Sequence, residues 1–140
     1  MWVARDQDTS IWLFTEKPVR RSDNVWDFSE YGSIISPRLS SFEIFHEMFP
    51  FLTWDNEPIE VEFIKMPGLW VARDECKSLF MYTHKPVKTD YNGVWEFTDG
   101  TSCEICSWMF PEVRWETDPI QVSLIRKRKI QKKRCGWPEI

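Results

Sequence analysis

The residues whose types and spacing are best suited to chemistry are two cysteines three positions apart, Cys103 and Cys106. With Cys76, Cys135 and His84 they form a set of thiol and imidazole groups of the kind that binds zinc, and two neighbouring thiols also suit a redox pair. A free cysteine, however, also packs as a small apolar side chain. We favour that structural role, expect no metal and no cofactor, and keep zinc and redox chemistry as the alternatives.

Basic side chains form a second candidate site, because they recur near the ends of the expected strands in both halves of the chain. Gathered at one edge of a sheet, they would bind phosphate or carboxylate, and arginine suits bidentate contact with either group. The alternative, which we favour, is that they form surface ion pairs beside turns and protect edge strands. The residues concerned are Arg5, Lys17, Arg20, Arg73, Lys85 and Lys88.

Aromatic side chains are the third candidate, with nine tryptophans, ten phenylalanines and three tyrosines among 140 residues. On an exposed sheet beside basic residues they would form a platform on which bases stack, worth about 1 to 3 kcal/mol per base. Buried, they would form the core and the contact between the two halves, which we favour for most of them. Nine tryptophans exceed the need of a small core, so some are expected at a partly exposed binding surface. The candidate rings are Trp12, Phe14, Trp26, Phe28, Phe80, Tyr82, Trp95 and Phe97.

The net charge of -4 hides a division between an acidic body and a basic end. Residues 1–125 carry 11 Lys and Arg against 21 Asp and Glu, whereas residues 126–140 carry seven against one. Such a tail binds the phosphates of nucleic acid, binds an anionic protein or lipid surface, or folds back on the acidic body. The candidate residues for an anionic partner are Arg126, Lys127, Arg128, Lys129, Lys132, Lys133 and Arg134.

No catalytic motif is found in the chain. It has no nucleophile elbow, phosphate-binding loop, dinucleotide-binding glycine motif or zinc-protease motif. The two histidines, His46 and His84, occupy unrelated positions. We therefore predict that the protein is not an enzyme.

An internal repeat organises these candidates. Residues 2–6 recur at 70–74 with a spacing of 68, and residues 48–50 recur at 109–111 with a spacing of 61. We predict a tandem duplication, with one copy over residues 1–65, a short linker over 66–69, a second copy over 70–125 and the basic tail over 126–140. The first copy carries an insert, Glu30 to Ser40.

The repeat bears on the cysteines. At the spacing of 61, Cys103 and Cys106 align with Phe42 and Phe45, two apolar residues on one face of a predicted helix. A zinc site would place ligands in one copy where the other has core phenylalanines. The alignment therefore favours packing over metal binding.

The hydrophobic pattern within each copy is mostly that of strands. In the first copy, Ile11 and Leu13 face one side while Trp12 and Phe14 face the other, and residues 78–83 repeat this alternation. We expect this strand to form a three-strand meander with the segments at 2–5 and 25–26, and with their equivalents in the second copy.

A short helix is expected after each meander, over 42–48 and over 103–109, because a proline follows each segment. Strand segments are then expected at 53–54 and 59–64, and at the equivalent positions 114–115 and 120–125. The predicted fold class is α+β, mainly β: two βββαββ units packed as one compact pseudo-twofold body.

The composition indicates a soluble, globular protein. Hydrophobic residues make up 42% of the chain, and no apolar run approaches the roughly 18 residues that span a bilayer. The first residues lack the pattern of a signal peptide. We expect a cytoplasmic protein without a membrane span.

One sequence of motifs occurs in both copies: residues 2–6, an aromatic strand, Lys-Pro-Val before a basic residue, and a lone tryptophan. A Phe-Pro pair with a tryptophan four residues beyond the proline, and a Pro-Ile-x-Val segment, complete it. This order resembles a small uncharacterised domain found in hypothetical proteins of gut bacteria and their phages. The resemblance covers nearly the whole chain apart from the tail and implies a phage or mobile-element setting, with no assigned activity and no catalytic residues. The insert departs from it.

These features favour a non-enzymatic binding module, an accessory protein that binds or inhibits a host protein or a nucleotide ligand through its aromatic and basic surface. The alternative is a nucleic-acid-binding protein that uses the basic tail. A small enzyme using Arg5 or Arg73 with nearby carboxylates is a further alternative.

Overall fold

The computed structural model describes residues 1–28, 34–36, 43–97 and 99–127. The protein is mainly β, with 42% strand and 4% helix, and its largest element is a curled antiparallel sheet. The elements in chain order are β1 (Trp2–Arg5), β2 (Ile11–Phe14), β3 (Val19–Arg20), β4 (Trp26–Asp27), β5 (Ile34–Ser36), α1 (Glu43–Met48), β6 (Ile59–Arg73), β7 (Leu79–Tyr82), β8 (Val87–Lys88), β9 (Trp95–Glu96), β10 (Ser102–Ile105) and β11 (Ile120–Arg126).

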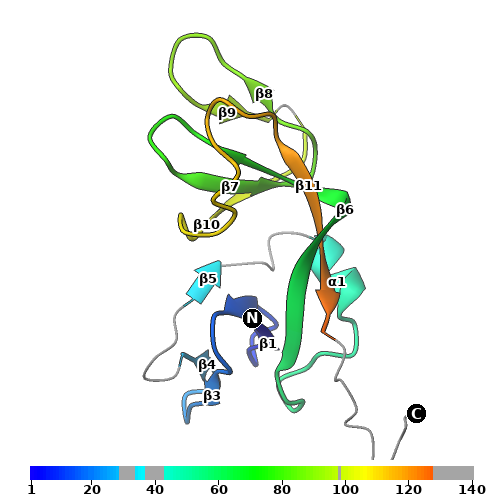
Figure 1. Ribbon diagram of the computed structural model, residues 1–140. Helices are drawn as coiled ribbons and strands as arrows, with labels where there is room; N and C mark the ends of the chain where they lie inside the picture. Colours follow the sequence, from blue (N-terminus) through cyan, green and yellow to red (C-terminus); the bar gives the residue numbers. More distant parts are fainter. Residues whose placement is uncertain (29–33, 37–42, 98, 128–140) are drawn as a thin grey trace, which may run out of the picture.

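The long strand β6 organises the sheet. Six strands follow the order β10-β7-β6-β1-β2-β5, and β11 also pairs with β6. In Figure 1 the elements before β6 lie below and those after it lie above, and β6 and β11 run past both groups. The segment expected to be a linker, residues 66–69, is part of β6, which continues from one half into the other.

The bend of β6 has a local cause. Opposite the Val122–Ser123 step of β11 the register jumps from Leu69 to Ile64, so residues 65–68 of β6 have no backbone ladder partner in β11. Pro67 cannot donate a hydrogen bond to a strand ladder, so it suits such a bulge. Next to it the two strands approach closely, and a Cβ added to Gly68 would lie 2.7 Å from the Val122 carbonyl oxygen.

The two faces of the sheet bury different side chains, as the alternation of β2 and β7 predicts. Ile11 and Leu13 point into the main core, whereas Phe14 and Trp12 belong to a separate cluster on the other face. The main core takes residues from both halves of the chain, including Leu52 and Leu124. The two halves are therefore buried against each other around one shared core.

The prediction of a helix over residues 103–109 is wrong. Residues Ser102–Ile105 form β10, which pairs antiparallel with β7 from Ser102 opposite Tyr82 to Ile105 opposite Leu79. A seven-residue helix is marginal in water, while the free edge of β7 offers a full set of hydrogen bonds. The expected helix over 42–48 is present as α1, whose described residues begin at Glu43.

Other expected elements also differ. Trp26 does not join β1 and β2 in a meander, because β4 pairs with β3 in a separate two-stranded sheet, and β9 pairs with β8 in the same way. Residues 53–54 and 114–115 lie outside the strands, in turn segments. Most of the insert lies outside the described residues, apart from β5, which pairs with β2. No helix among the described residues is long and apolar enough to cross a membrane.

Candidate binding surface

Each half of the sheet carries an aromatic cluster on the face away from the main core. The first aromatic cluster has Phe14 and Trp26 at its centre, with Trp2, Trp12 and Trp54 packed around them. Trp26 and Trp54 meet edge to face, with ring centroids 5.6 Å apart. Such pairs contribute about 0.5 to 1.5 kcal/mol beyond the area that they bury.

The second aromatic cluster has Tyr82 and Trp95 at its centre, with Trp70, Phe80 and Trp115 around them. Trp95 and Trp115 again meet edge to face, at 5.9 Å. Burial raises the pKa of the Tyr82 hydroxyl, which donates to the Trp95 carbonyl oxygen. These central rings are packed within the protein, as the core interpretation expects.

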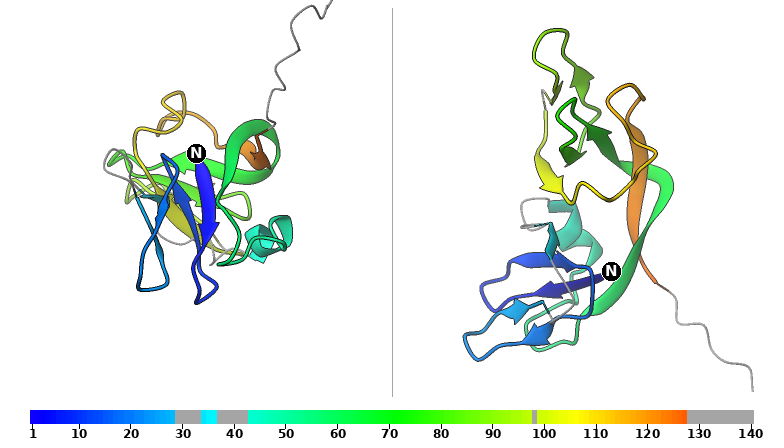
Figure 2. Two further views of the ribbon diagram at one scale, coloured as in Figure 1. Left: turned by 90° about the horizontal axis from the view of Figure 1, so that it is seen from below. Right: turned by 60° about the vertical axis from the view of Figure 1, so that its left-hand side comes forward.

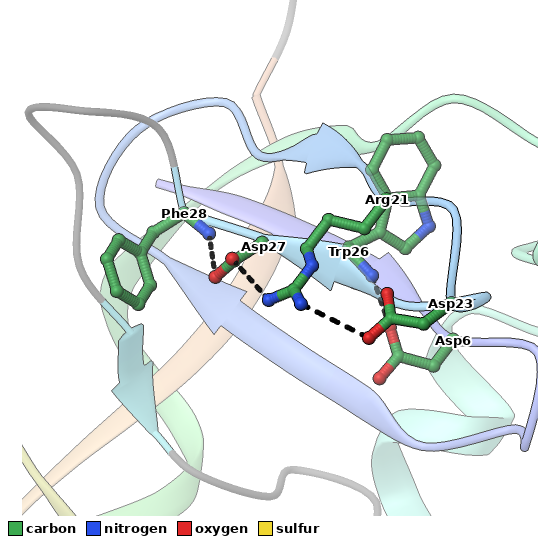
Figure 3. Close-up of polar contacts among 6 residues, drawn as sticks. All are labelled: Asp6, Arg21, Asp23, Trp26, Asp27 and Phe28. Atoms are coloured by element: carbon green, nitrogen blue, oxygen red, sulfur yellow. Dashed lines mark hydrogen bonds and ion pairs between the residues drawn. The ribbon is translucent and has the colours of Figure 1, made fainter.

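A buried aspartate holds the central tryptophan of each cluster. The Asp6 carboxylate accepts a hydrogen bond from the Trp26 backbone N–H at 2.8 Å (Figure 3), and Asp74 accepts one from Trp95 at 2.9 Å. Burial raises the pKa of both carboxyls, and these hydrogen bonds partly oppose the shift. The Trp12 indole N–H lies near the Asp6 carboxylate and also lowers its pKa, yet makes no hydrogen bond of good geometry.

The candidate residues Arg5 in β1 and Arg73 in β6 donate hydrogen bonds to backbone carbonyl oxygens instead of pointing into solvent. Arg73 uses all five of its N–H donors on carbonyl oxygens: Nε on Val113 at 2.6 Å, and the terminal nitrogens on Lys77, Ser107, Met109 and Phe110 at 2.9 to 3.2 Å. A guanidinium has no sixth donor, so Arg73 can bind an anion only by releasing one of these contacts.

Arg5 makes a similar but smaller set of contacts. It donates to the carbonyl oxygens of Leu52, Thr9 and Phe49, and one terminal nitrogen lies 3.0 Å from His46 Nδ1.

At the spacing of 61, Ser107 matches His46 in the sequence. A cleft of about 480 Å³ lies beside Ser107. Its lining includes Arg73, Asp74, Lys77, Ser107, Arg114 and Trp115.

The cations of the short hairpins cover the aromatic clusters. The Arg20 guanidinium lies 4.5 Å from the Trp54 ring centroid and donates to the Trp54 carbonyl oxygen. Lys88 lies 4.1 Å from the Trp115 centroid and makes the equivalent hydrogen bond. Both contacts are within the protein, and each is a cation–π contact worth about 0.5 to 1 kcal/mol at an exposed site.

Accessible lysines and aromatic rings remain in each half of the chain. Lys17 lies over the half-buried Trp2 ring at 5.6 Å, and Lys85 lies over Trp70 at 5.5 Å. Each half also has a phenylalanine that is about half exposed. Phe28, directly after β4, is 48% exposed, and Phe97, directly after β9, is 45% exposed. Figure 3 shows the Phe28 ring pointing away from the ion pairs of Arg21. We call these six residues the lysine–aromatic rims: Lys17, Trp2 and Phe28 in the first half, Lys85, Trp70 and Phe97 in the second.

Only two residues of the basic tail are described. Arg126 lies 5.8 Å from the Phe51 ring centroid, and Lys127 pairs with Glu60 at 3.5 Å. Both line a cleft of about 450 Å³ that also includes Trp2 and Lys17. The other candidate residues, Arg128, Lys129, Lys132, Lys133 and Arg134, lie outside the described residues.

The cysteines occupy apolar surroundings. Cys103 and Cys106 pack against the main core, burial raises the pKa of the Cys106 thiol, and Cys76 is exposed. Within the described ranges, no group of three or more metal-binding side chains comes together. Cys135 lies outside those ranges.

Sequence reasoning missed the tryptophans that pack beside Trp26 and Trp95. Trp54 and Trp115 each follow a Phe-Pro pair by four residues, so the repeat marked them, but the pattern did not indicate which ring each one contacts. It also missed that Arg5 and Arg73 would gather carbonyl oxygens from segments 34 to 47 residues away. A search of protein-family models, a search of curated proteins and a search of solved structures each find no match to this chain.

Proposed function

We propose that this protein is a non-enzymatic binding module, a phage or mobile-element accessory protein that binds or inhibits a host protein or nucleotide-type ligand. The carrying observation is the pair of lysine–aromatic rims, each with a lysine over a half-buried tryptophan and a phenylalanine about half exposed. Accessible rings beside cations favour contact with a partner that offers apolar or π-stacked groups and negative charge.

We infer that the two rims arose by tandem duplication. Equivalent residues make equivalent contacts: Asp6 with Trp26 and Asp74 with Trp95, at 2.8 and 2.9 Å. Phe63 and Leu124, which match at the spacing of 61, are paired with each other in the β6–β11 ladder. This pairing supports a pseudo-twofold body with its axis near these two residues, and hence two related binding surfaces in one chain.

Removal of the exposed phenylalanines tests the proposal. The double variant Phe28→Ala/Phe97→Ala should lose the host protein or nucleotide that the wild-type chain retains in a pull-down from host lysate, assayed by mass spectrometry for both classes. The control is Tyr91→Ala, which removes a more exposed ring, 84%, outside both rims. Equal retention by all three proteins, with folding verified by circular dichroism, would contradict the proposal.

A second candidate function is nucleic-acid binding through the tail. It is favoured by the cleft that holds Arg126 and Lys127 beside Trp2, because single-stranded nucleic acid is bound by cations that track phosphates and rings that stack on bases. Removal of residues 128–140 takes away five cations, so the slope of log K against log salt should change by about 3.5 for single strands. An unchanged slope would refute this function.

A further inference from the structure

The outer edge of β11 is open. β6 pairs with β11 along one edge, from Val71 opposite Ile120 to Val61 opposite Arg126, and with β1 and β7 along the other. No other described strand pairs with β11. In the right-hand view of Figure 2, β6 and β11 lie along one side of the molecule.

The backbone groups of β11 alternate in direction. Lys127 donates its N–H to the Glu60 carbonyl oxygen, on the side of β6. Alternate residues of a strand face opposite edges, so Leu124 and Arg126 present their N–H and C=O groups away from β6. Among the described residues, no hydrogen bond reaches the backbone of Ile120–Arg126 from that side.

This edge is longer than the edges of the two terminal strands of the sheet. β11 has seven residues, whereas the terminal strands β10 and β5 have four and three. Very short edge strands resist further pairing, while a long one is a template for another strand. We propose that β11 pairs antiparallel with β11 of a second copy of this chain, so that two sheets join around a twofold axis.

The distribution of charge along β11 favours a second copy of this chain as the partner of its open edge. The turn before β11 is acidic, with Asp118, and the end of β11 is basic, with Arg126 and Lys127. When Val122 faces Val122 of a second copy, Asp118 of each copy lies opposite Arg126 of the other. The chain already uses this complementarity internally, because Lys127 at the end of β11 pairs with Glu60 at the start of β6 at 3.5 Å.

A charge exchange tests the pairing. The full chain should form a dimer that depends on concentration in sedimentation equilibrium. Asp118→Arg and Arg126→Asp, each alone, should weaken that dimer about tenfold or more, because each places two like-charged pairs at the interface. An equimolar mixture of the two variants should restore it, since both pairs are then opposite in charge. Within one chain the two positions are about 27 Å apart along an extended strand, so restoration requires two copies.

Asp90→Arg, at an exposed position in the loop between β8 and β9, is the control for charge reversal and should leave the dimer unchanged. A full chain that stays monomeric at all concentrations would overturn the proposal. So would a dimer that neither variant weakens, or a mixture that does not restore it. A chain ended at Lys127 that dimerises while the full chain stays monomeric would assign the edge to the chain's own tail, and would also overturn it.

Discussion

Replacement of Arg73 by lysine tests whether a single guanidinium fixes the segment that follows β10. Arg73 donates to five carbonyl oxygens, and four of them belong to Ser107, Met109, Phe110 and Val113. Lysine has three donors on one nitrogen, so at least two of the five carbonyls lose their hydrogen bond to residue 73. Hydrogen bonds to charged groups contribute about 1.5 to 3 kcal/mol each, and water can replace those that are exposed.

We therefore expect Arg73→Lys to lower the free energy of unfolding by about 3 kcal/mol, a large part of the roughly 5 to 15 kcal/mol of a typical domain. Arg5→Lys should cost less, about 1 kcal/mol, because Arg5 donates to only three carbonyl oxygens and a lysine has three donors. Urea unfolding followed by tryptophan fluorescence measures both changes.

Arg114→Lys is the matched control for these substitutions. Arg114 is an exposed cation of the same cleft, and its replacement should change stability by less than about 0.5 kcal/mol. A cost for Arg73→Lys within that range, or no greater than the cost for Arg5→Lys, would refute the assignment of Arg73 as the centre of this segment.

Substitutions at Asp74 and Gly68 test the buried carboxylate and the strand bulge. Burial raises the pKa of Asp74, so the folded state binds the proton more tightly than the unfolded state, and stability should fall as pH rises from the ordinary value of about 3.9 through the raised one. Asp74→Asn keeps an acceptor for the Trp95 N–H and should remove this pH dependence in a series of urea midpoints. Asp74→Ala leaves that N–H unpaired and should lower the free energy of unfolding by about 1 to 3 kcal/mol at pH 7. An Asn variant as unstable as the Ala variant would contradict this expectation. Gly68→Ala should lower the free energy of unfolding by about 1 to 3 kcal/mol in the same assay, because its Cβ would meet the Val122 carbonyl oxygen. Met66→Ala, at an exposed neighbouring position, is the control and should change stability little. Equal effects of the two substitutions would argue against a close approach of the strands.

Much of the local structure could be predicted from the sequence because it depends on neighbours along the chain. The alternation in β2 assigned Leu13 to the core and Trp12 to the other face, and the proline after Phe49 correctly ended α1. The helix expected over 103–109 failed because those few residues have no strong local preference, and the free edge of β7 decided their conformation.

The candidate site could be predicted only in part. The sequence identified Arg5, Arg73 and the central aromatic rings, but an arginine beside a turn looks the same whether it binds solvent, a ligand or backbone. The choice depended on carbonyl oxygens as distant in sequence as Leu52 is from Arg5. Four central rings, those of Phe14, Trp26, Tyr82 and Trp95, are at most 9% exposed, whereas Phe28 and Phe97 of the lysine–aromatic rims are about half exposed.

By itself the sequence determined the alternating faces of the strands, the recurring motifs and the separation of an acidic body from a basic end. These are properties of composition and short-range period. The tertiary structure alone decided that residues 66–69 continue β6, that both halves share one core, and that β11 pairs along β6 and leaves its outer edge open. These depend on pairing between segments some 60 residues apart, where hydrogen bonding and burial, rather than local preference, select the partner.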